Sequence, residues 1–321
     1  MPKEPVVVVP LDFSPDTEAT VSAAFSVAKH CGAEVHLLEV RPQRRPSLLG
    51  AAADARLGSE VKRDWSRLEP SIRTAESGGL RVRTVAYRGN AIETIAAYVQ
   101  LTKARLLVVG KHYRSSRWPR NTRFVSTLTR SAPGPVLVLP SQRRSAKHGP
   151  VFFRHIVSAI DFTVASAIAL RTVLDLIHQS GAQLTVVHAL NDAPRMAFSG
   201  GEAGRAARIL RDQASQAAEQ LRGKIPADVR VDARVTTSAP HRAILDVASE
   251  VDADLIVMGV PPRSRLDEVL FGSTLRRVLR GTKIPVLVLP VPAGAYHWLE
   301  QTGGEAVAPA ARRPRRARRS P

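Results

Sequence analysis

The chain has little cysteine, few aromatic residues and no long apolar run. Its 321 residues include one cysteine, and 5% are aromatic. The single cysteine, Cys31, excludes an intramolecular disulfide, and its place before Gly32 favours a packed thiol at a helix end. No apolar run approaches the roughly 18 residues that span a bilayer, and the valines at 6–9 are too few for the apolar region of a signal peptide. We therefore expect a cytoplasmic protein without a membrane span.

Sequence motifs for catalysis and for metal binding are also missing. The nine histidines form no H-E-x-x-H pattern and no paired Cys/His spacing, so we expect no metal site. The chain has no G-x4-G-K-[ST], no G-x-G-x-x-G and no G-x-S-x-G. Asp267 and Glu268 are adjacent carboxylates that serve equally well as solvated surface. The sequence favours a binding protein over a dedicated enzyme.

The charge is strongly basic and unevenly distributed. The formal net charge is +19 at pH 7, and residues 1–147 carry most of the excess. A basic surface raises the local concentration of anions such as nucleic acid, acidic headgroups and nucleotides. A compositional bias toward arginine explains the excess equally well, so charge alone selects no partner.

An internal repeat dominates the organisation of the chain. Residues 134–140 read GPVLVLP and residues 284–290 read IPVLVLP, 150 positions later. Two further pairs occur in the same order, 8–14 with 157–163 and 104–110 with 253–259. Three matched anchors in one order predict a duplicated domain.

Short apolar runs alternate with longer amphipathic stretches inside each copy. In the first copy the runs are 6–9, 35–40, 82–86, 106–109 and 136–139. Continuous apolar runs separated by helix-length segments are typical of a parallel sheet covered by helices on both faces. We predict a doubly wound α/β fold in each copy. Ser14 followed by Pro15 predicts a helix that starts directly after the first strand, with Ser14 as its N-cap.

Composition also predicts the domain boundaries. The polar, basic segment 141–150 ends in Gly-Pro and reads as a linker, which divides the chain into domains at 1–147 and 148–292. Residues 293–321 lack periodicity and end in an arginine-rich run, so we expect a disordered basic tail. Such a tail gives weak, sequence-independent contact with polyanions.

Ligands of doubly wound sheets bind beyond the carboxyl ends of the strands, where the strand order reverses. In the second copy this rule selects residues after the first and fourth strands and at the start of the last helix. They are Asp161, Met258, Gly259, Pro261, Pro262, Gly272, Ser273 and Thr274. A helix start with a glycine and two hydroxyls can seat a phosphate. Each feature also has a plain structural reading: Asp161 as a cap of the next helix, and Gly272 with Ser273 as an ordinary helix start.

These residues in this order resemble the universal stress protein family, whose nucleotide motif is G-x2-G-x9-G-[ST]. The second copy matches it at Gly259, Gly272 and Ser273 and departs from it at Pro262, which lacks an amide donor. The resemblance implies a Rossmann-like domain of the adenine nucleotide alpha hydrolase type. It also implies that Asp161 meets adenine, that the backbone near Ala189 lines the same pocket, and that Gly272 and Ser273 hold phosphate oxygens.

The first copy departs further from the motif. It keeps Asp12 and Gly110, but Tyr113 stands where the second glycine is expected, and Thr122 stands where Gly272 does. Its loop is basic, with Lys111 and Arg114 among the charged residues. We therefore expect a degenerate site in the first copy.

The sequence thus predicts a stress-response or signalling module that binds ATP, or ADP or AMP, mainly in its second copy. The alternative is a nucleotide-free protein that recruits an anionic partner through its basic first copy and tail. The last strands, 136–139 and 286–289, are apolar and are expected at the sheet edges. Pairing of the two edges with each other would protect both from aggregation. We expect an internal pseudo-dimer of the two copies, and a further homodimer of tandem chains remains open.

Overall fold

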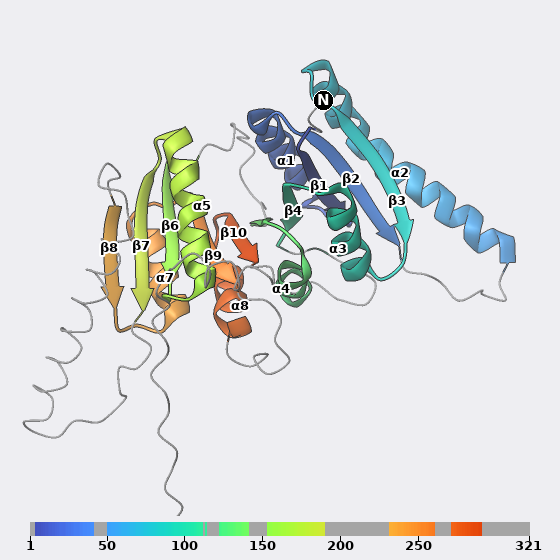
Figure 1. Ribbon diagram of the computed structural model, residues 1–321. Helices are drawn as coiled ribbons and strands as arrows, with labels where there is room; N and C mark the ends of the chain where they lie inside the picture. The colour runs from blue at the N-terminus through green and yellow to red at the C-terminus, as the bar shows by residue number, and fades with distance from the viewer. Residues whose placement is uncertain are drawn as a thin grey trace, which may run out of the picture.

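The computed structural model describes residues 4–41, 50–111, 113, 122–140, 153–189, 231–260 and 271–290. They contain a ten-stranded sheet in the order β3-β2-β1-β4-β5-β10-β9-β6-β7-β8 (Figure 1). Neighbouring strands are parallel except β5 and β10, which are antiparallel. The two copies of the repeat therefore share one sheet and have the same internal strand order.

The elements of the first copy coincide with its apolar runs and amphipathic stretches. They are β1 (Val6–Leu11), α1 (Thr17–Cys31), β2 (Glu34–Arg41), α2 (Gly50–Ser77), β3 (Val82–Arg88), α3 (Ala91–Thr102), β4 (Leu106–Gly110), α4 (Thr122–Ser131) and β5 (Val136–Leu139). The Val-rich strands β1 and β5 are buried along their whole length, as expected for strands covered on both faces.

The second copy repeats this alternation. Its elements are β6 (His155–Ile160), α5 (Val164–Ser180), β7 (Gln183–Ala189), β8 (Val231–Thr236), α7 (Pro240–Glu250), β9 (Leu255–Val260), α8 (Phe271–Gly281) and β10 (Val286–Pro290). The boundaries predicted at 147/148 and 292/293, the linker and the basic tail all lie outside the described residues.

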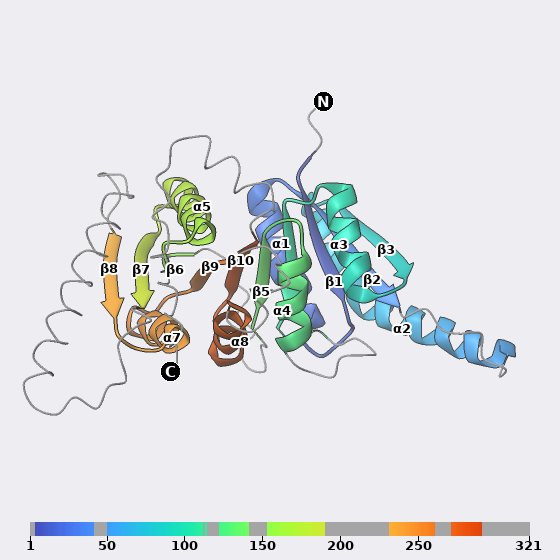
Figure 2. The ribbon, with the colours of Figure 1, turned by 60° about the horizontal axis from the view of Figure 1, so that its bottom comes forward.

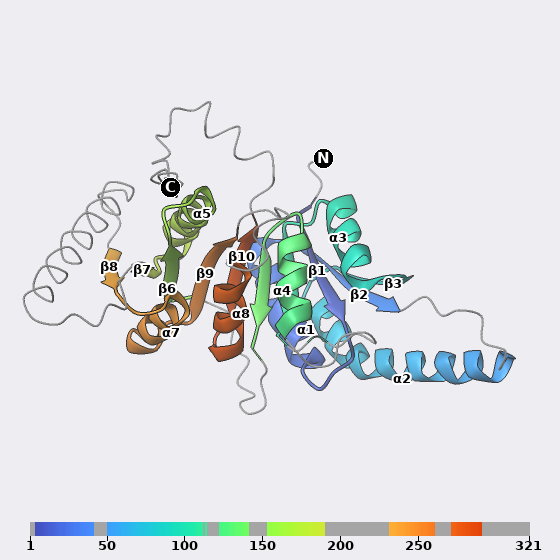
Figure 3. The ribbon, with the colours of Figure 1, turned by 90° about the horizontal axis from the view of Figure 1, so that it is seen from below.

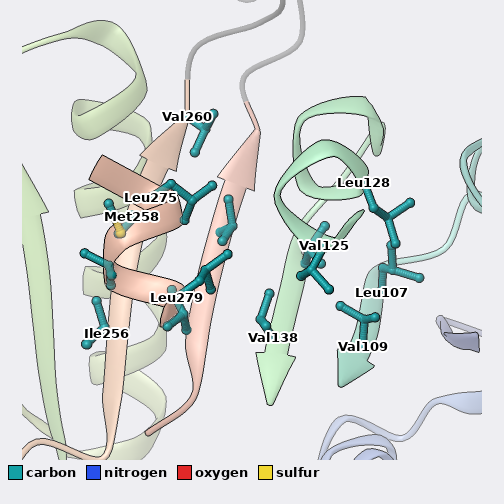
Figure 4. Packing of buried hydrophobic residues seen from close by; sticks show 14 of the residues in the cluster. Leu107, Val109, Val125, Leu128, Val138, Ile256, Met258, Val260, Leu275 and Leu279 are labelled. Carbon is teal, nitrogen blue, oxygen red and sulfur yellow. The ribbon is translucent and has the colours of Figure 1, made fainter. Parts of the chain in front are cut away.

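Helices cover both faces of the sheet, which confirms the predicted doubly wound fold (Figures 2 and 3). Buried residues of α3, α4, α7 and α8 pack on one face, and those of α1, α2 and α5 pack on the other. Burial of one such Val, Leu or Ile side chain contributes about 1.5–3 kcal/mol. The core on the first face runs without a break from Leu107 and Val125 in the first copy to Met258 and Leu279 in the second (Figure 4).

The junction between the copies is a strand pair with a helix pair above it. Val136, Leu137 and Val138 of β5 pair with Val288, Leu287 and Val286 of β10. On one face α4 packs against α8. The expected contact between the two last strands is therefore present, and it covers two apolar edges that would otherwise be open to aggregation.

Two local expectations are wrong. Helix α1 begins at Thr17, and its N-cap is Asp16 rather than Ser14. The Asp12 carboxylate accepts hydrogen bonds from Ser14 N at 3.0 Å and from Thr17 Oγ1 at 2.9 Å, which holds residues 12–16 in a turn before the helix. Cys31 is exposed rather than packed, because it is the last residue of α1 and lies off the buried stripe that ends at Ala28.

Candidate functional site

Each copy has a topological switch point, where its strand order reverses between the first and fourth strands. It lies between β1 and β4 in the first copy and between β6 and β9 in the second. In the second copy Asp161 follows β6, Ala189 ends β7 and Gly259 lies near the end of β9. Helix α8 follows β9 and leads to the parallel strand β10, so its first turn, with Gly272, is at the same edge. The fold brings these four predicted site residues to one edge of the sheet.

Asp161 is exposed and fixes the turn that precedes α5. Its Oδ1 accepts hydrogen bonds from Thr163 N at 3.1 Å and from Thr163 Oγ1 at 2.6 Å. Thr163 is the N-cap of α5, and its Oγ1 accepts from Ser166 N at 3.3 Å. The plain structural reading of Asp161 as the cap of α5 is therefore wrong: Asp161 positions the capping residue, Thr163, and its own carboxylate stays at the switch point.

Two aromatic residues lie beside Asp161: His188, and Phe162, for which the sequence reasoning had predicted no role. Phe162 lies 4.6 Å from His188, measured between ring centroids. His188 Nδ1 is 2.8 Å from the Ile160 carbonyl oxygen, and because a carbonyl only accepts, Nδ1 carries the hydrogen. The available signal was the repeat itself, since a phenylalanine follows the strand-one aspartate in both copies. Both phenylalanines have positive φ, 51° at Phe13 and 59° at Phe162.

The packing of α5 on β9 requires a glycine at position 259. A Cβ at this position would lie 2.1 Å from Ala165 O and 2.8 Å from Ser166 N. The first turn of α5 therefore rests directly on β9. The side chain of the preceding residue, Met258, points into the core and is buried, so only its backbone can face a ligand.

The last helix of the second copy supplies the polar groups at this edge. Gly272, Ser273 and Thr274 form the first turn of α8, where helix amides lack partners within the helix. Ser273 and Thr274 are half-buried. Pro261 and Pro262 lie outside the described residues.

The first copy has a different arrangement at its switch point. Tyr113 is buried, its hydroxyl donates to Leu11 O at 3.3 Å, and its ring stacks on Phe124 with centroids 4.7 Å apart. The cavity lined by Asp12, Gly110, Tyr113 and their neighbours is about 10 Å³, roughly the space of one water. Burial, together with Asp12 and Glu39, raises the pKa of Tyr113, so its phenol stays a neutral donor.

Lys111 joins the two copies. Its Nζ donates to the carbonyl oxygens of Arg280 at 2.9 Å and Thr282 at 3.0 Å, at the C-terminal end of α8. The end of a helix carries partial negative charge, so a cation there is favoured. Burial lowers the pKa of Lys111. The position after Gly259 in the second copy is Val260, so this contact is made from the first copy alone.

The described ranges contain neither a metal-ligand cluster nor a membrane-spanning helix. No group of three or more His, Cys, Asp or Glu side chains is arranged there to hold a metal ion. Within those ranges no helix combines the length and apolar character needed to cross a membrane.

Comparison with known proteins relates both copies to one family. A universal stress protein of Mycobacterium tuberculosis is 32% identical over 178 residues, which cover 52% of this chain and 52% of the relative. One from Methanocaldococcus jannaschii is 23% identical over 149 residues, covering 46% of this chain and 87% of the relative. The chain thus spans about half the length of the mycobacterial relative.

Solved structures match almost the whole chain. A universal stress protein from Archaeoglobus fulgidus aligns with a TM-score of 0.63 at 18% identity, over 89% of this chain and 98% of that one. A functionally unknown protein from Pseudomonas aeruginosa aligns with a TM-score of 0.59 at 21% identity, over 93% and 96%. At these identities the likeness concerns the fold alone.

One family model matches both copies of the repeat. The model of the universal stress protein family matches residues 5–140 and again residues 152–290. Each match begins at or before the first strand of a copy and ends with its last strand, β5 or β10. The chain therefore belongs to the universal stress protein family, as a tandem of two such domains.

Proposed function

We propose that this protein is a stress-response or signalling module whose second copy binds an adenine nucleotide, with ATP as the first candidate and ADP and AMP as the others. Family membership supports the stress-response role. The observation that carries the site assignment is the difference between the two switch points. Tyr113 fills the first, whereas the second has the Gly272–Thr274 helix start at the same edge of the sheet as Asp161. The proposal assigns no catalytic residue, since hydrolysis would need a positioned base or metal around the phosphates.

The base end of the proposed site lies between the ends of β6 and β7. The Asp161 carboxylate can accept a hydrogen bond from the exocyclic amine of adenine, which is a donor. The rings of Phe162 and His188 are adjacent and offer aromatic contact area to a purine. The backbone of Ala189 continues β7 past His188 and lines the same end of the site.

The phosphate end of the proposed site is the first turn of α8. The backbone amides of a helix's first turn point outward along its axis, and together with the helix dipole they favour an anion by about 0.3–1 kcal/mol at an exposed position. Gly272 lets a phosphate approach the backbone closely, and the hydroxyls of Ser273 and Thr274 add donors. The backbone from Met258 to Pro262 would close the remaining side.

Titration of ATP into two matched variants tests the assignment. Gly272→Glu places a carboxylate at the phosphate end of the second copy, and Thr122→Glu places one at the corresponding position of the first. We expect Gly272→Glu to weaken ATP at least about tenfold, equivalent to about 1.4 kcal/mol, and Thr122→Glu to leave the affinity unchanged. Loss of binding in Thr122→Glu with retention in Gly272→Glu would assign the nucleotide to the first copy.

A second candidate is a nucleotide-free protein that recruits an anionic partner. It is favoured by Gly259, because packing of α5 on β9 requires a glycine there without any ligand. Mass spectrometry of small molecules released from the purified protein separates the two candidates. An adenine nucleotide in the released fraction supports the first, and its absence together with no measurable ATP binding supports the second.

A further inference from the structure

A cluster of arginines lies at the junction of the two copies, on the face covered by α3, α4, α7 and α8. Helix α8 packs against α4 on one side and against α7 on the other (Figures 2 and 3). Among the side chains that the structure describes, these three helices carry Arg130 on α4, Arg242 on α7, and Arg276, Arg277 and Arg280 on α8, which we call the arginine strip. Arg130 is half-buried and the other four are exposed. The strip spans the seam between the two domains.

The centre of the arginine strip has no acidic residue within its own helices. Neither α4 (Thr122–Ser131) nor α8 (Phe271–Gly281) contains an Asp or Glu. The acidic residues on the neighbouring helices are Glu93 on α3 and Asp246 and Glu250 on α7. The positive charge also acts locally: after burial, Arg277 and Arg242 are the groups that lower the pKa of His241, and Asp246 only partly opposes them.

A general excess of arginine does not account for this cluster. On the opposite face of the sheet two arginines pair with acids: Arg67 of α2 pairs with Glu18 of α1 at 3.2 Å, and Arg73 pairs with Glu69 within α2. Helices α4 and α8 cannot form such internal pairs, because they have no acids. These two helices therefore carry positive charge that no acid of the same helix offsets.

We propose that the arginine strip binds the sugar–phosphate backbone of duplex nucleic acid without reading its sequence. Guanidinium groups match phosphate oxygens in a two-pronged geometry and lose less hydration than lysine. Helix α8 is about 16 Å long, so its arginines can contact several successive phosphates.

Other anionic partners fit the strip less well. Binding to a membrane surface favours exposed apolar anchors beside the cations. Among the described residues the exposed large hydrophobic side chains are Tyr87 and Leu101, which lie on β3 and α3. Single-stranded nucleic acid favours aromatic stacking platforms, and none of the residues of α4 and α8 that the structure describes as exposed is aromatic.

Fluorescence anisotropy with a labelled 20-base-pair DNA duplex (about two helical turns) tests the proposal on the full chain. The strip variant is Arg242→Glu with Arg277→Glu. The control is Arg105→Glu with Arg171→Glu, two exposed arginines outside the strip that give the same change in net charge and keep the same tail. We expect the strip variant to bind at least about tenfold more weakly, with a slope of log K against log salt reduced by about two. The control should differ from the wild type by about twofold or less.

Three results would overturn the proposal: no duplex binding by the wild type at low salt, equal loss in the strip variant and the control, or strip-dependent binding to phosphatidylserine vesicles without binding to DNA. Folding is checked independently of binding. Thermal unfolding of both variants should match the wild type, and the His241 pKa, followed by NMR, should rise in the strip variant as two nearby cations are removed.

Discussion

The two switch points of the sheet began as the same structure and now differ in one loop. Both copies keep an aspartate after the first strand, followed by a phenylalanine with positive φ, a conformation that costs about 1–3 kcal/mol in a bulky residue. The loop after the fourth strand has changed. In the first copy Lys111 and Tyr113 are buried, one against the second domain and one within its own switch point. Features set by the backbone have persisted through duplication, and features set by loop side chains have diverged.

The largest expected effect on the free energy of unfolding comes from removing the Tyr113 side chain, which occupies the first switch point. Tyr113→Ala removes a buried ring that stacks on Phe124, and we expect it to lower the free energy of unfolding by about 3–5 kcal/mol. Tyr113→Phe keeps the ring and loses only the hydrogen bond to Leu11 O, at a cost of about 1 kcal/mol. Urea unfolding measures both. Equal, small losses in the two variants would show that the ring does not fill the site.

Alanine substitution of the motif glycine in each copy compares how tightly the two copies pack against this position. Gly259→Ala forces a Cβ to within 2.1 Å of the Ala165 carbonyl oxygen, so we expect a loss of about 2–3 kcal/mol. Gly110→Ala meets only Thr20 Oγ1, at 3.1 Å, and this side chain can shift, so its cost should be under about 1 kcal/mol. Thermal unfolding of the pair checks the order, and a larger loss at Gly110 would contradict the packing account.

The contact made by Lys111 should depend on pH. Lys111→Met leaves the Arg280 and Thr282 carbonyls without this donor, and we expect a loss of about 1–2 kcal/mol, whereas exposed Lys283→Met should cost little. Because burial lowers the folded pKa of Lys111, the unfolded chain holds more protons between that pKa and 10.5. The contribution of Lys111 to stability therefore rises as pH increases through this window.

Urea titrations of the wild type and Lys111→Met at pH 7, 8 and 9 measure this contribution as a difference. A difference that shrinks with rising pH would contradict the buried position of the ammonium group. Both proteins keep the same tyrosines, so tyrosine ionisation cancels from the comparison.

The smallest expected effect compares the two strand-one aspartates. Asp161 is exposed and its bonds lie within its own turn, so Asp161→Ala should lower the unfolding free energy by about 0.5–1 kcal/mol. Asp12 is half-buried beside Tyr113, so Asp12→Ala should cost more. Chemical denaturation orders the two variants. A greater loss for Asp161→Ala would contradict this order and show that the turn of the second copy contributes more to the free energy of unfolding.

The apolar pattern along the chain and its repetition were sufficient to predict the strands and the fold of each copy. The apolar runs at 6–9 and 136–139 became β1 and β5, and the repeat gave both copies the same strand order. The shared edge of Asp161, Gly259 and Gly272 was predicted by the rule that ligands of parallel α/β sheets bind beyond the carboxyl ends of the strands. The predicted Ser14 cap failed because a carboxylate two residues earlier, at Asp12, bonds the same segment.

The sequence by itself determined the duplicated domain, the doubly wound sheet and the sheet edge shared by Asp161, Gly259 and Gly272, because apolar periodicity and strand order are local or repeated signals. Only the tertiary structure decided what Lys111 and Tyr113 contact, and that α8 packs between α4 and α7. Lys111 meets carbonyls 169 and 171 residues away, and no periodicity relates such positions. The direction of the Lys111 side chain depends on how the two copies meet, so it is settled only when β5 pairs with β10.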